Sequence, residues 1–250
     1  MKERYFTFDQ LNEYDEIIHL STKKGMNFST PIVGIDGIEE GFRKIEIDIG
    51  YEFRAIKTPC QIHSNHVRVL TEDNLDEEFS DTDGIVTNLK NVALGIRTAD
   101  CQSILLYDPE RKVIGNIHSG WKGTLNKIVV NAIKLMIREY ESEAKDILAF
   151  ICPSIMKCCF EVDKDVVDSF VENFGNIDEF VTLGEVKEGK QKYFIDMVEL
   201  NKKVMMDLGL EKDNIISSDI CTKCHCDIYH SYRADGKMSE RNLSLICIKK

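Results

Sequence analysis

Two histidines and a cysteine occur where apolar segments of the sequence give way to polar or glycine-containing turns. They are His63 in CQIHSNHV, Cys101 in TADCQ and His118 in NIHSGWKG. Proteins often place functional side chains at such boundaries, where a rigid scaffold meets solvent. Two imidazoles and a thiolate suit Zn²⁺, and three protein ligands leave a fourth position open. The residue types therefore predict a catalytic metal site. The alternative is that Cys101 is a small buried side chain and that each histidine bonds a carbonyl group.

Asp100 and Trp121 are neighbours of this trio that could add chemistry. Asp100 directly precedes Cys101 and is a candidate to orient a histidine or to accept a proton, although it could equally cap a turn. Trp121 is the only tryptophan and follows a glycine. It could line a pocket or stack on a base, and core packing is the alternative.

A second cysteine-rich segment, CTKCHC at 221–226, resembles half of a zinc knuckle. Its candidate ligands are Cys221, Cys224, Cys226 and His225. Cys158 and Cys159 could complete such a site, but there is no second CxxC motif, and one CxxC is only moderately specific. Free thiols are the default expectation, and a second metal is the alternative.

The composition predicts a globular cytoplasmic protein. The chain has 250 residues, of which 43% are hydrophobic, and this is enough to bury a core. Its net charge of -11 disfavours nucleic-acid binding, because phosphate contacts need clustered cations. No apolar run of about eighteen residues is present to span a membrane, and the N-terminus lacks the apolar core of a signal peptide. The nine cysteines are therefore expected to be reduced.

Short apolar runs separated by turns predict a β-rich core. Strands are expected at 84–87, 92–96, 103–107, 113–117, 147–153, 228–232 and 243–249, and the alternating segment 43–49 predicts a half-buried strand. Helices are expected from a cap at Thr124 to about 140, at 163–174, and at 197–208, where Gly209 would end the helix. Strands and helices mix without regular alternation, which favours an α+β or mixed α/β fold in a single domain.

Five segments occur in the order of the motifs of a known family: TADCQSILLYD, HSGWKG, CPSIMKCCFEV, YFIDMVELNKKVMMDLG and SDICTKCHCDIYHSYRADG. In this order they resemble motifs of the YfiH/YlmD family, also called laccase-domain or polyphenol-oxidase-like proteins and purine nucleoside phosphorylases. The resemblance covers roughly residues 55–250, and residues 1–54 match less well. It implies one α/β domain over 1–250, with mixed β-sheets flanked by helices and related to a bacterial toxin deamidase.

The resemblance also implies a cofactor and a reaction. In that family the residues corresponding to His63, Cys101 and His118 bind one zinc, with copper as the alternative metal. Family members cleave adenosine, inosine, guanosine and methylthioadenosine with phosphate, and also deaminate adenosine. The implied partners of this chain are thus a purine nucleoside and phosphate, with neither nucleic acid nor membrane, and the protein is expected to be a monomer or weak homodimer.

The substrate contacts are matched less closely than the metal ligands. The family's N-terminal Arg-x-Gly-Gly segment is represented by LSTKKGMNFST, its HAGWRG motif by HSGWKG, and its late Thr-Gly-Arg by the residues ending at Arg241. Arg233 and Arg241 are candidates to bind phosphate or substrate, because guanidinium matches phosphate bidentately; a solvated surface charge is the alternative. Ser64 and Trp121 are further candidate substrate contacts.

Three rival functions use the same residues. A copper laccase is disfavoured, because a multicopper centre needs many imidazoles, whereas this chain has six histidines and no His-x-His pair. A metal-free cysteine hydrolase or deamidase would use Cys101 as nucleophile and His118 as base. A peptidoglycan-editing factor would use the same Cys101 and His118. A non-catalytic, metal-stabilised protein that binds cell-wall precursors is the third alternative.

Overall fold

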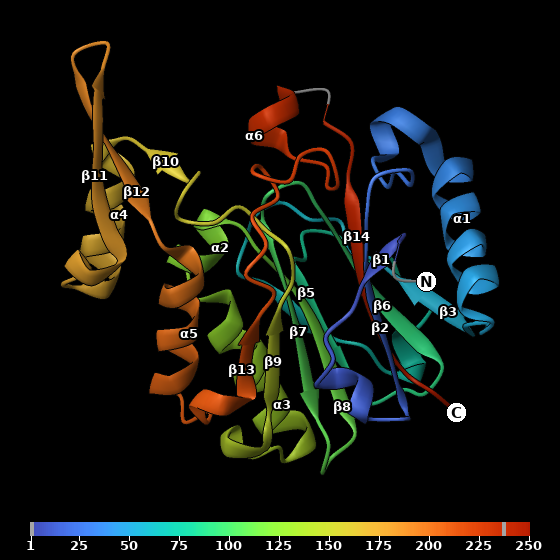
Figure 1. Ribbon diagram of the computed structural model, residues 1–250. Coiled ribbons are helices and arrows are strands. Elements are labelled where there is room, and N and C mark those ends of the chain that lie inside the picture. The colour runs from blue at the N-terminus through green and yellow to red at the C-terminus, as the bar shows by residue number, and fades with distance from the viewer. Residues whose placement is uncertain (1–2, 237–238) are drawn as a thin grey trace.

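Two β-sheets lie face to face at the centre of the computed structural model, which describes residues 3–236 and 239–250 (Figure 1). One sheet has the order β1 (Tyr5–Phe6), β2 (Ile17–Thr22), β14 (Asn242–Ile248), β6 (Val92–Thr98) and β3 (Ala55–Lys57). The other has the order β13 (Ile215–Ser217), β9 (Leu148–Ile151), β7 (Gln102–Asp108), β8 (Val113–Ser119), β5 (Gly84–Thr87) and β4 (Val67–Val69). The pairs β3–β6, β4–β5 and β9–β13 are parallel and the other pairs antiparallel. The predicted fold class with mixed sheets is confirmed.

The central strands are apolar on both faces because both faces are covered. Along β7, Leu105 and Tyr107 face the five-stranded sheet, whereas Ile104 and Leu106 face the helices on the outside. A strand buried on both sides needs a continuous apolar run rather than an alternating one. Asn116 of β8 is one of the buried polar residues in these strands, and its amide donates to main-chain oxygens of the opposite sheet.

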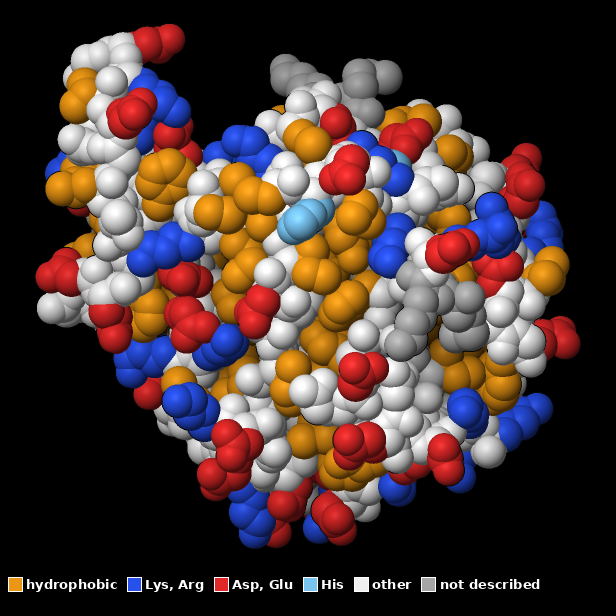
Figure 2. Space-filling view, in the orientation of Figure 1, with side chains coloured by type: hydrophobic (Ala, Val, Ile, Leu, Met, Phe, Trp, Pro, Cys, Tyr) orange, Lys and Arg blue, Asp and Glu red, His pale blue; other side chains and the backbone are white. Residues whose placement is uncertain are grey.

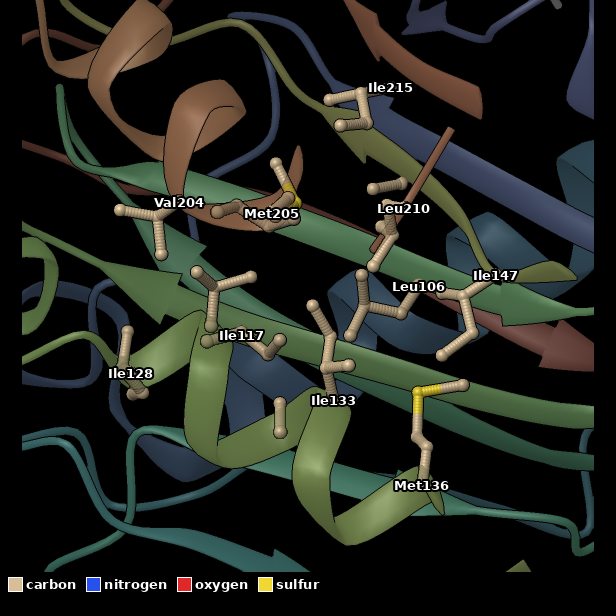
Figure 3. Close-up of a cluster of buried hydrophobic side chains, with 14 of the residues drawn as sticks. Leu106, Ile117, Ile128, Ile133, Met136, Ile147, Val204, Met205, Leu210 and Ile215 are labelled. Carbon is tan, nitrogen blue, oxygen red and sulfur yellow. The ribbon is translucent and has the colours of Figure 1, made fainter. Parts of the chain in front are cut away.

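Helices cover the outer faces of both sheets. α3 (Ile128–Tyr140) and α5 (Met197–Asp207) lie on the six-stranded sheet, where Ile133 and Met136 of α3 and Met205 of α5 pack with the strands (Figure 3). Fully burying a side chain of this size stabilises the fold by about 1.5–3 kcal/mol. α1 (Thr30–Ile49) packs on the five-stranded sheet. No helix within the described residues is long and apolar enough to cross a membrane.

A smaller third sheet projects from this body (Figure 1). Its order is β10 (Glu161–Val162), β12 (Lys190–Ile195) and β11 (Val181–Lys187), and α4 (Lys164–Phe174) packs beside it. The remaining helices are α2 (Trp121–Leu125) and α6 (Tyr232–Asp235). Single 3-10 turns occur at Leu11–Glu13, Glu72–Asn74, Ala144–Asp146, Asp178–Phe180 and Lys212–Asn214.

The strand predicted at 43–49 is wrong, because this segment is the last part of α1. The alternation of RKIEIDI favoured a strand when read alone. Over a longer window, Ile38, Phe42, Ile45 and Ile49 recur at three- and four-residue intervals, and all four pack in one cluster. Ile47, which the alternating pattern grouped with Ile45, is 79% exposed. The helical period therefore decides the structure of this segment.

Two other local predictions are also wrong. Residues 228–231 form no strand, and residue 232 is the first residue of α6, whose N-cap Ser231 accepts a hydrogen bond from Ala234 N. Thr124 does not cap the long helix: it lies inside α2, and α3 starts only at Ile128. The hydroxyl of Thr124 instead pairs with Ser119 Oγ. The other predicted strands correspond to β5 to β9 and β14, and the other two helices to α4 and α5.

Candidate active site

The three predicted metal ligands come together at one end of the two sheets. β7 and β8 pair antiparallel, so Cys101, immediately before β7, lies beside His118 near the end of β8. His63 reaches them from the loop between β3 and β4. The three ligand atoms all lie within 4.8 Å of one another, and Cys101 Sγ is 3.9 Å from His63 Nε2. The two imidazole rings are 4.7 Å apart at 76°. This arrangement can hold one metal ion through three protein ligands.

A buried carboxylate that the sequence analysis missed orients this trio. Asp83 precedes β5 and accepts a 2.7 Å hydrogen bond from Nδ1 of His118. It also accepts the backbone N–H groups of His63 and Ser64 at 3.0 and 2.7 Å. With Nδ1 engaged, the Nε2 atom of His118 is left for a metal or a thiolate. Asp83 therefore holds two of the three ligand-bearing segments.

The charges of the trio are strongly coupled. Burial by itself would raise the pKa of the Cys101 thiol, but His118 and His63 outweigh it and lower the pKa to about 6. Burial would also disfavour protonated His118, but Cys101 and Asp83 stabilise its charge and raise its pKa to about 9. Burial would raise the pKa of Asp83, yet hydrogen bonds from His118 and Ser64 hold that pKa well below its usual range. The site thus favours a thiolate, the form that binds metals and attacks electrophiles.

The backbone is tightly constrained around the trio. Gly120 is the N-cap of α2, and a Cβ atom there would lie 3.0 Å from Cys101 Sγ and 3.1 Å from His63 Cδ2. A residue without a side chain is therefore needed for this close approach. His63 and Asp100 both adopt positive φ angles, 64° and 83°. Such unfavourable conformations persist only where the surrounding structure imposes them, and they often cluster at functional sites.

The trio opens into a cavity of about 620 Å³. Its lining comprises Phe28, Ser29, Thr30, Pro31, Gln61, His63, Arg97, Thr98, Ala99, Asp100, Cys101, Gln102, His118, Ser119, Gly120, Trp121, Ile155, Phe160, Met197, Tyr232, Arg233 and Arg241. Figure 2 shows hydrophobic side chains gathered across the middle of the face below α6, with Lys and Arg dispersed among Asp and Glu. The cavity is large enough for a small organic substrate and combines apolar walls with a few charged groups.

Two of the predicted site residues, Ser64 and Asp100, make hydrogen bonds to other parts of the chain. Ser64 is not among the residues that line the cavity, and its hydroxyl donates to Asp83 at 2.7 Å. Its hydroxyl thus contacts the same carboxylate that accepts the backbone amides of the His63 loop. Asp100 lines the cavity, but its carboxylate accepts Thr222 Oγ1 at 2.7 Å and Arg233 N at 2.6 Å. Asp83, not Asp100, is the carboxylate that orients a histidine.

Three arginines contribute positive charge to the cavity. Arg233 and Arg241 were predicted from the sequence, and Arg97, directly before the TADC motif, was missed. β6 and β14 pair so that Arg97 lies opposite Leu243, which brings Arg97 and Arg241 to the same sheet end. Burial lowers the pKa of the Arg97 guanidinium, and the charge of Arg241 adds to this effect. Arg233 is exposed, and its guanidinium donates to the carbonyl oxygens of Cys159 and Glu161.

The described residues contain a second group that could hold a metal. It comprises Cys158, Cys159, Cys221 and Cys224. Two other residues of the CTKCHC segment, His225 and Cys226, are not members of this group. All nine cysteines lie within the described residues and carry free thiols there.

The amino-acid sequence matches a known family over most of its length. The family model described as multi-copper polyphenol oxidoreductase laccase matches residues 36–249. Purine nucleoside phosphorylase YlmD of Bacillus subtilis is 34% identical over 196 residues, which are 76% of this chain and 69% of that relative. Adenosine deaminase RL5, from an unknown prokaryotic organism, is 28% identical over 207 residues, 80% of this chain and 78% of that relative. Relatives of this chain thus carry the names of two purine nucleoside enzymes.

Solved structures share the fold over nearly the whole chain. The crystal structure of the Bacillus licheniformis hypothetical protein YfiH aligns with a TM-score of 0.86 at 25% identity, covering 99% of this chain and 97% of that chain. The structure of YlmD from Geobacillus stearothermophilus aligns with a TM-score of 0.83 at 22% identity, covering 95% and 93%. The arrangement of two packed sheets and outer helices is therefore common to these proteins.

Proposed function

The chain belongs to the multi-copper polyphenol oxidoreductase laccase family, and from this membership and the geometry of its site we propose that it is a zinc-dependent purine nucleoside phosphorylase. The resemblance to the YfiH/YlmD family read from its motifs is confirmed. The proposal rests on one observation: His63, Cys101 and His118 lie together in the wall of a cavity of nucleoside size. The names of the relatives supply the substrate class.

The donor set fits zinc. Two imidazoles and a thiol that favours its ionised form are ligands typical of Zn²⁺, and three such ligands are usual in catalytic sites. The hydrogen bond from His118 Nδ1 to Asp83 is the outer contact that zinc-binding histidines commonly make. A zinc ion bound there would supply a Lewis acid at the wall of the cavity.

The chain's own residues can bind and orient both substrates. In phosphorolysis, a phosphate oxygen forms a bond to the anomeric carbon of the ribose while the bond to the purine nitrogen breaks. The purine leaves with the electron pair and takes up a proton. Arg97 and Arg241 bind the phosphate in this proposal, because their guanidiniums donate to neutral oxygens, which leave their charge uncompensated. Trp121 and Phe160 offer apolar surface for the purine and help to exclude water.

Adenosine deamination is a second candidate activity, favoured by the relative named adenosine deaminase RL5. It would use the same cavity, with water instead of phosphate as the second reactant. The amino group of adenosine would leave as ammonia and inosine would remain. The two reactions are therefore distinguished by their need for phosphate.

The rival functions fit the site less well. A multicopper oxidase needs several imidazole-rich copper centres. The described residues contain two groups that could hold a metal ion; one has only two histidines, and the other consists of cysteines alone. A cysteine hydrolase would use the Cys101 thiolate with His118 and would need no metal. A cell-wall-binding protein would bind without turnover. Chelation and product analysis separate these alternatives.

The deciding experiment is chromatography of inosine and adenosine incubated with the protein, with and without phosphate. Phosphate-dependent release of hypoxanthine from inosine, lost in Cys101→Ala and retained in Cys226→Ala, is the expected result, since Cys226 belongs to neither candidate metal group. Removal of metal by a chelator should abolish turnover, and added Zn²⁺ should restore it. A zinc-loaded protein that leaves both nucleosides intact would overturn the proposal, whereas activity that survives chelation would favour the cysteine hydrolase.

A further inference from the structure

Four cysteine sulfurs meet in one cluster outside the cavity. Cys158 and Cys159 lie in the segment after β9, and Cys221 and Cys224 lie in the segment after β13. Their Sγ atoms are all within 4.8 Å of one another. Cys224 Sγ is 3.6 Å from that of Cys158 and 3.5 Å from that of Cys159. In a tetrahedral site with Zn–S bonds of about 2.3 Å, neighbouring sulfurs are about 3.8 Å apart. The cluster therefore has nearly the dimensions of a four-cysteine metal site.

The backbone fixes the two cysteine-bearing segments beside each other. Cys221 is the buried member of the cluster, and it forms a parallel bridge with Ser154 of the other segment. In this bridge Ser154 N donates to Ile220 O and Thr222 N donates to Ser154 O. The four sulfurs are therefore brought together by main-chain pairing, which is independent of the ionisation of the thiols.

We propose that Cys158, Cys159, Cys221 and Cys224 bind a structural metal ion of the Zn²⁺ type, separate from the ion held by the His63 trio. On binding, each thiol releases its proton to solvent and its sulfur donates an electron pair to the metal, so no oxidant or reductant takes part. Four protein ligands leave no open position, which is the property of a structural rather than a catalytic site.

This metal would fasten one wall of the active-site cavity. Cys159 is followed by Phe160, which lines the cavity, and its own carbonyl oxygen accepts a hydrogen bond from Arg233. Cys221 is followed by Thr222, whose hydroxyl donates to Asp100. Asp100 in turn accepts Arg233 N. The two cysteine-bearing segments thus hold Arg233 from two sides, and an ion that joins them would keep this wall in place.

A disulfide is the competing chemistry for the same thiols. Cys224 is close enough to Cys158 and Cys159 to pair with either after a small movement. A disulfide would use two of the four sulfurs, however, and would not account for the approach of the other two, which include the buried Cys221. The convergence of all four sulfurs therefore favours a metal.

The test counts metal in the full-length protein purified anaerobically with reductant. His63→Ala/His118→Ala removes two ligands of the first site, so the metal content of this double variant, measured by plasma mass spectrometry, reports on the cysteine cluster alone. The expected result is one zinc per chain, reduced to none when Cys224→Ser is added and unchanged when Cys226→Ser is added instead. Cys224→His, which retains a metal-binding side chain, should keep the ion and thereby show that the loss is not a folding defect.

Cobalt provides a second readout. In the same double variant, Co²⁺ should give the visible absorption and thiolate-to-metal charge transfer of a tetrahedral thiolate site, and Cys224→Ser should abolish both. Absence of zinc and cobalt from the double variant would overturn the proposal, as would equal losses in Cys224→Ser and Cys226→Ser. Peptide mass mapping of the anaerobic protein could instead find a Cys158–Cys224 or Cys159–Cys224 disulfide. That result would overturn the metal site and assign these thiols a redox role. Metal binding by the cysteine cluster is measured in a variant that lacks the proposed catalytic metal site. The outcome therefore does not depend on whether the protein is a phosphorylase.

Discussion

The carboxylate of Asp83 and the Nδ1 atom of His118 lie 2.7 Å apart in the interior, where the two residues are 0% and 3% exposed. The same carboxylate holds the loop that carries His63. A buried pair of this kind is costly to break from one side, because the remaining partner is left without compensation. Asp83 is therefore a positioning residue for the two histidines of the trio, although it would not itself touch a substrate.

Asp83→Asn should weaken metal binding by about 10–100-fold, the usual effect of losing an outer contact to a metal ligand. Oδ1 accepts both His118 Nδ1 and His63 N, whereas Oδ2 accepts the backbone amide and the hydroxyl of Ser64. The amide has one acceptor oxygen in place of two, so its NH₂ group would face one of these two sets of donors. Zinc affinity is measured by competition with a chromophoric chelator. Asp81→Asn, an exposed change two residues away, is the matched control. Equal zinc affinity in both variants would show that Asp83 does not orient the site.

Gly120→Ala should lower metal affinity and activity with little loss of stability. The φ of −72° at this position suits alanine, so the effect comes from the Cβ atom that meets Cys101 and His63. Overpacking of this kind typically costs about 1–3 kcal/mol. If the strain is relieved by displacing Cys101 or His63, zinc affinity falls by roughly 5- to 150-fold. Gly189→Ala, which is strained at φ 74° but lies in the β11–β12 turn, controls for general destabilisation. A normal zinc affinity in Gly120→Ala would contradict the close approach.

Arg97→Lys and Arg241→Lys should each raise the KM for phosphate by about tenfold, the equivalent of about 1.4 kcal/mol, while changing the KM for inosine little. Lysine keeps the charge but loses the planar pair of donors that matches phosphate. Initial rates at varied phosphate and fixed inosine measure this effect. Arg233→Lys serves as the comparison, because Arg233 lies in α6 and not at the sheet end that Arg97 and Arg241 share. If Arg233→Lys raises the phosphate KM most, the phosphate lies on that side of the cavity instead.

The stability of the fold should fall between about pH 6.5 and 4 because of His19. This residue of β2 is buried, and its Nε2 accepts the Phe8 N–H, which requires a neutral ring. Burial lowers the pKa of His19 to about 4. The unfolded chain takes up a proton near pH 6.5 whereas the folded chain does not, so the contribution is complete above pH 6.5 and is lost as the pH falls towards 4. The loss is at most about 3 kcal/mol.

Urea unfolding at several pH values tests this linkage. His19→Gln should lower the free energy of unfolding at pH 7 but should flatten its dependence on pH over this interval. His225→Gln, a change at an exposed histidine, is the control and should leave the slope unchanged. An unaltered slope in His19→Gln would assign the acid sensitivity to other groups.

Many of the strands and helices could be predicted from the local order of apolar and polar residues. The strands near 84, 92, 103 and 113 are continuous apolar runs, and their burial on both faces explains why they were recognisable. The segment 43–49 failed because an alternating pattern in a short window is also compatible with one face of a helix. Only its packing with Ile38 and Phe42 resolves that ambiguity.

The sequence by itself determined the fold class, the family, and the residue types of the metal trio, because these depend on apolar periodicity and on motifs that are contiguous in the chain. The tertiary structure alone decided which carboxylate serves the trio and which cysteines meet. Asp83 is 35 residues from His118, and Cys158 is 66 residues from Cys224. Pairing of β5 with β8, and of β9 with β13, brings these partners together. Hydrogen bonds and metal coordination act over a few ångströms, so such partners are defined by the packing of strands rather than by spacing along the sequence.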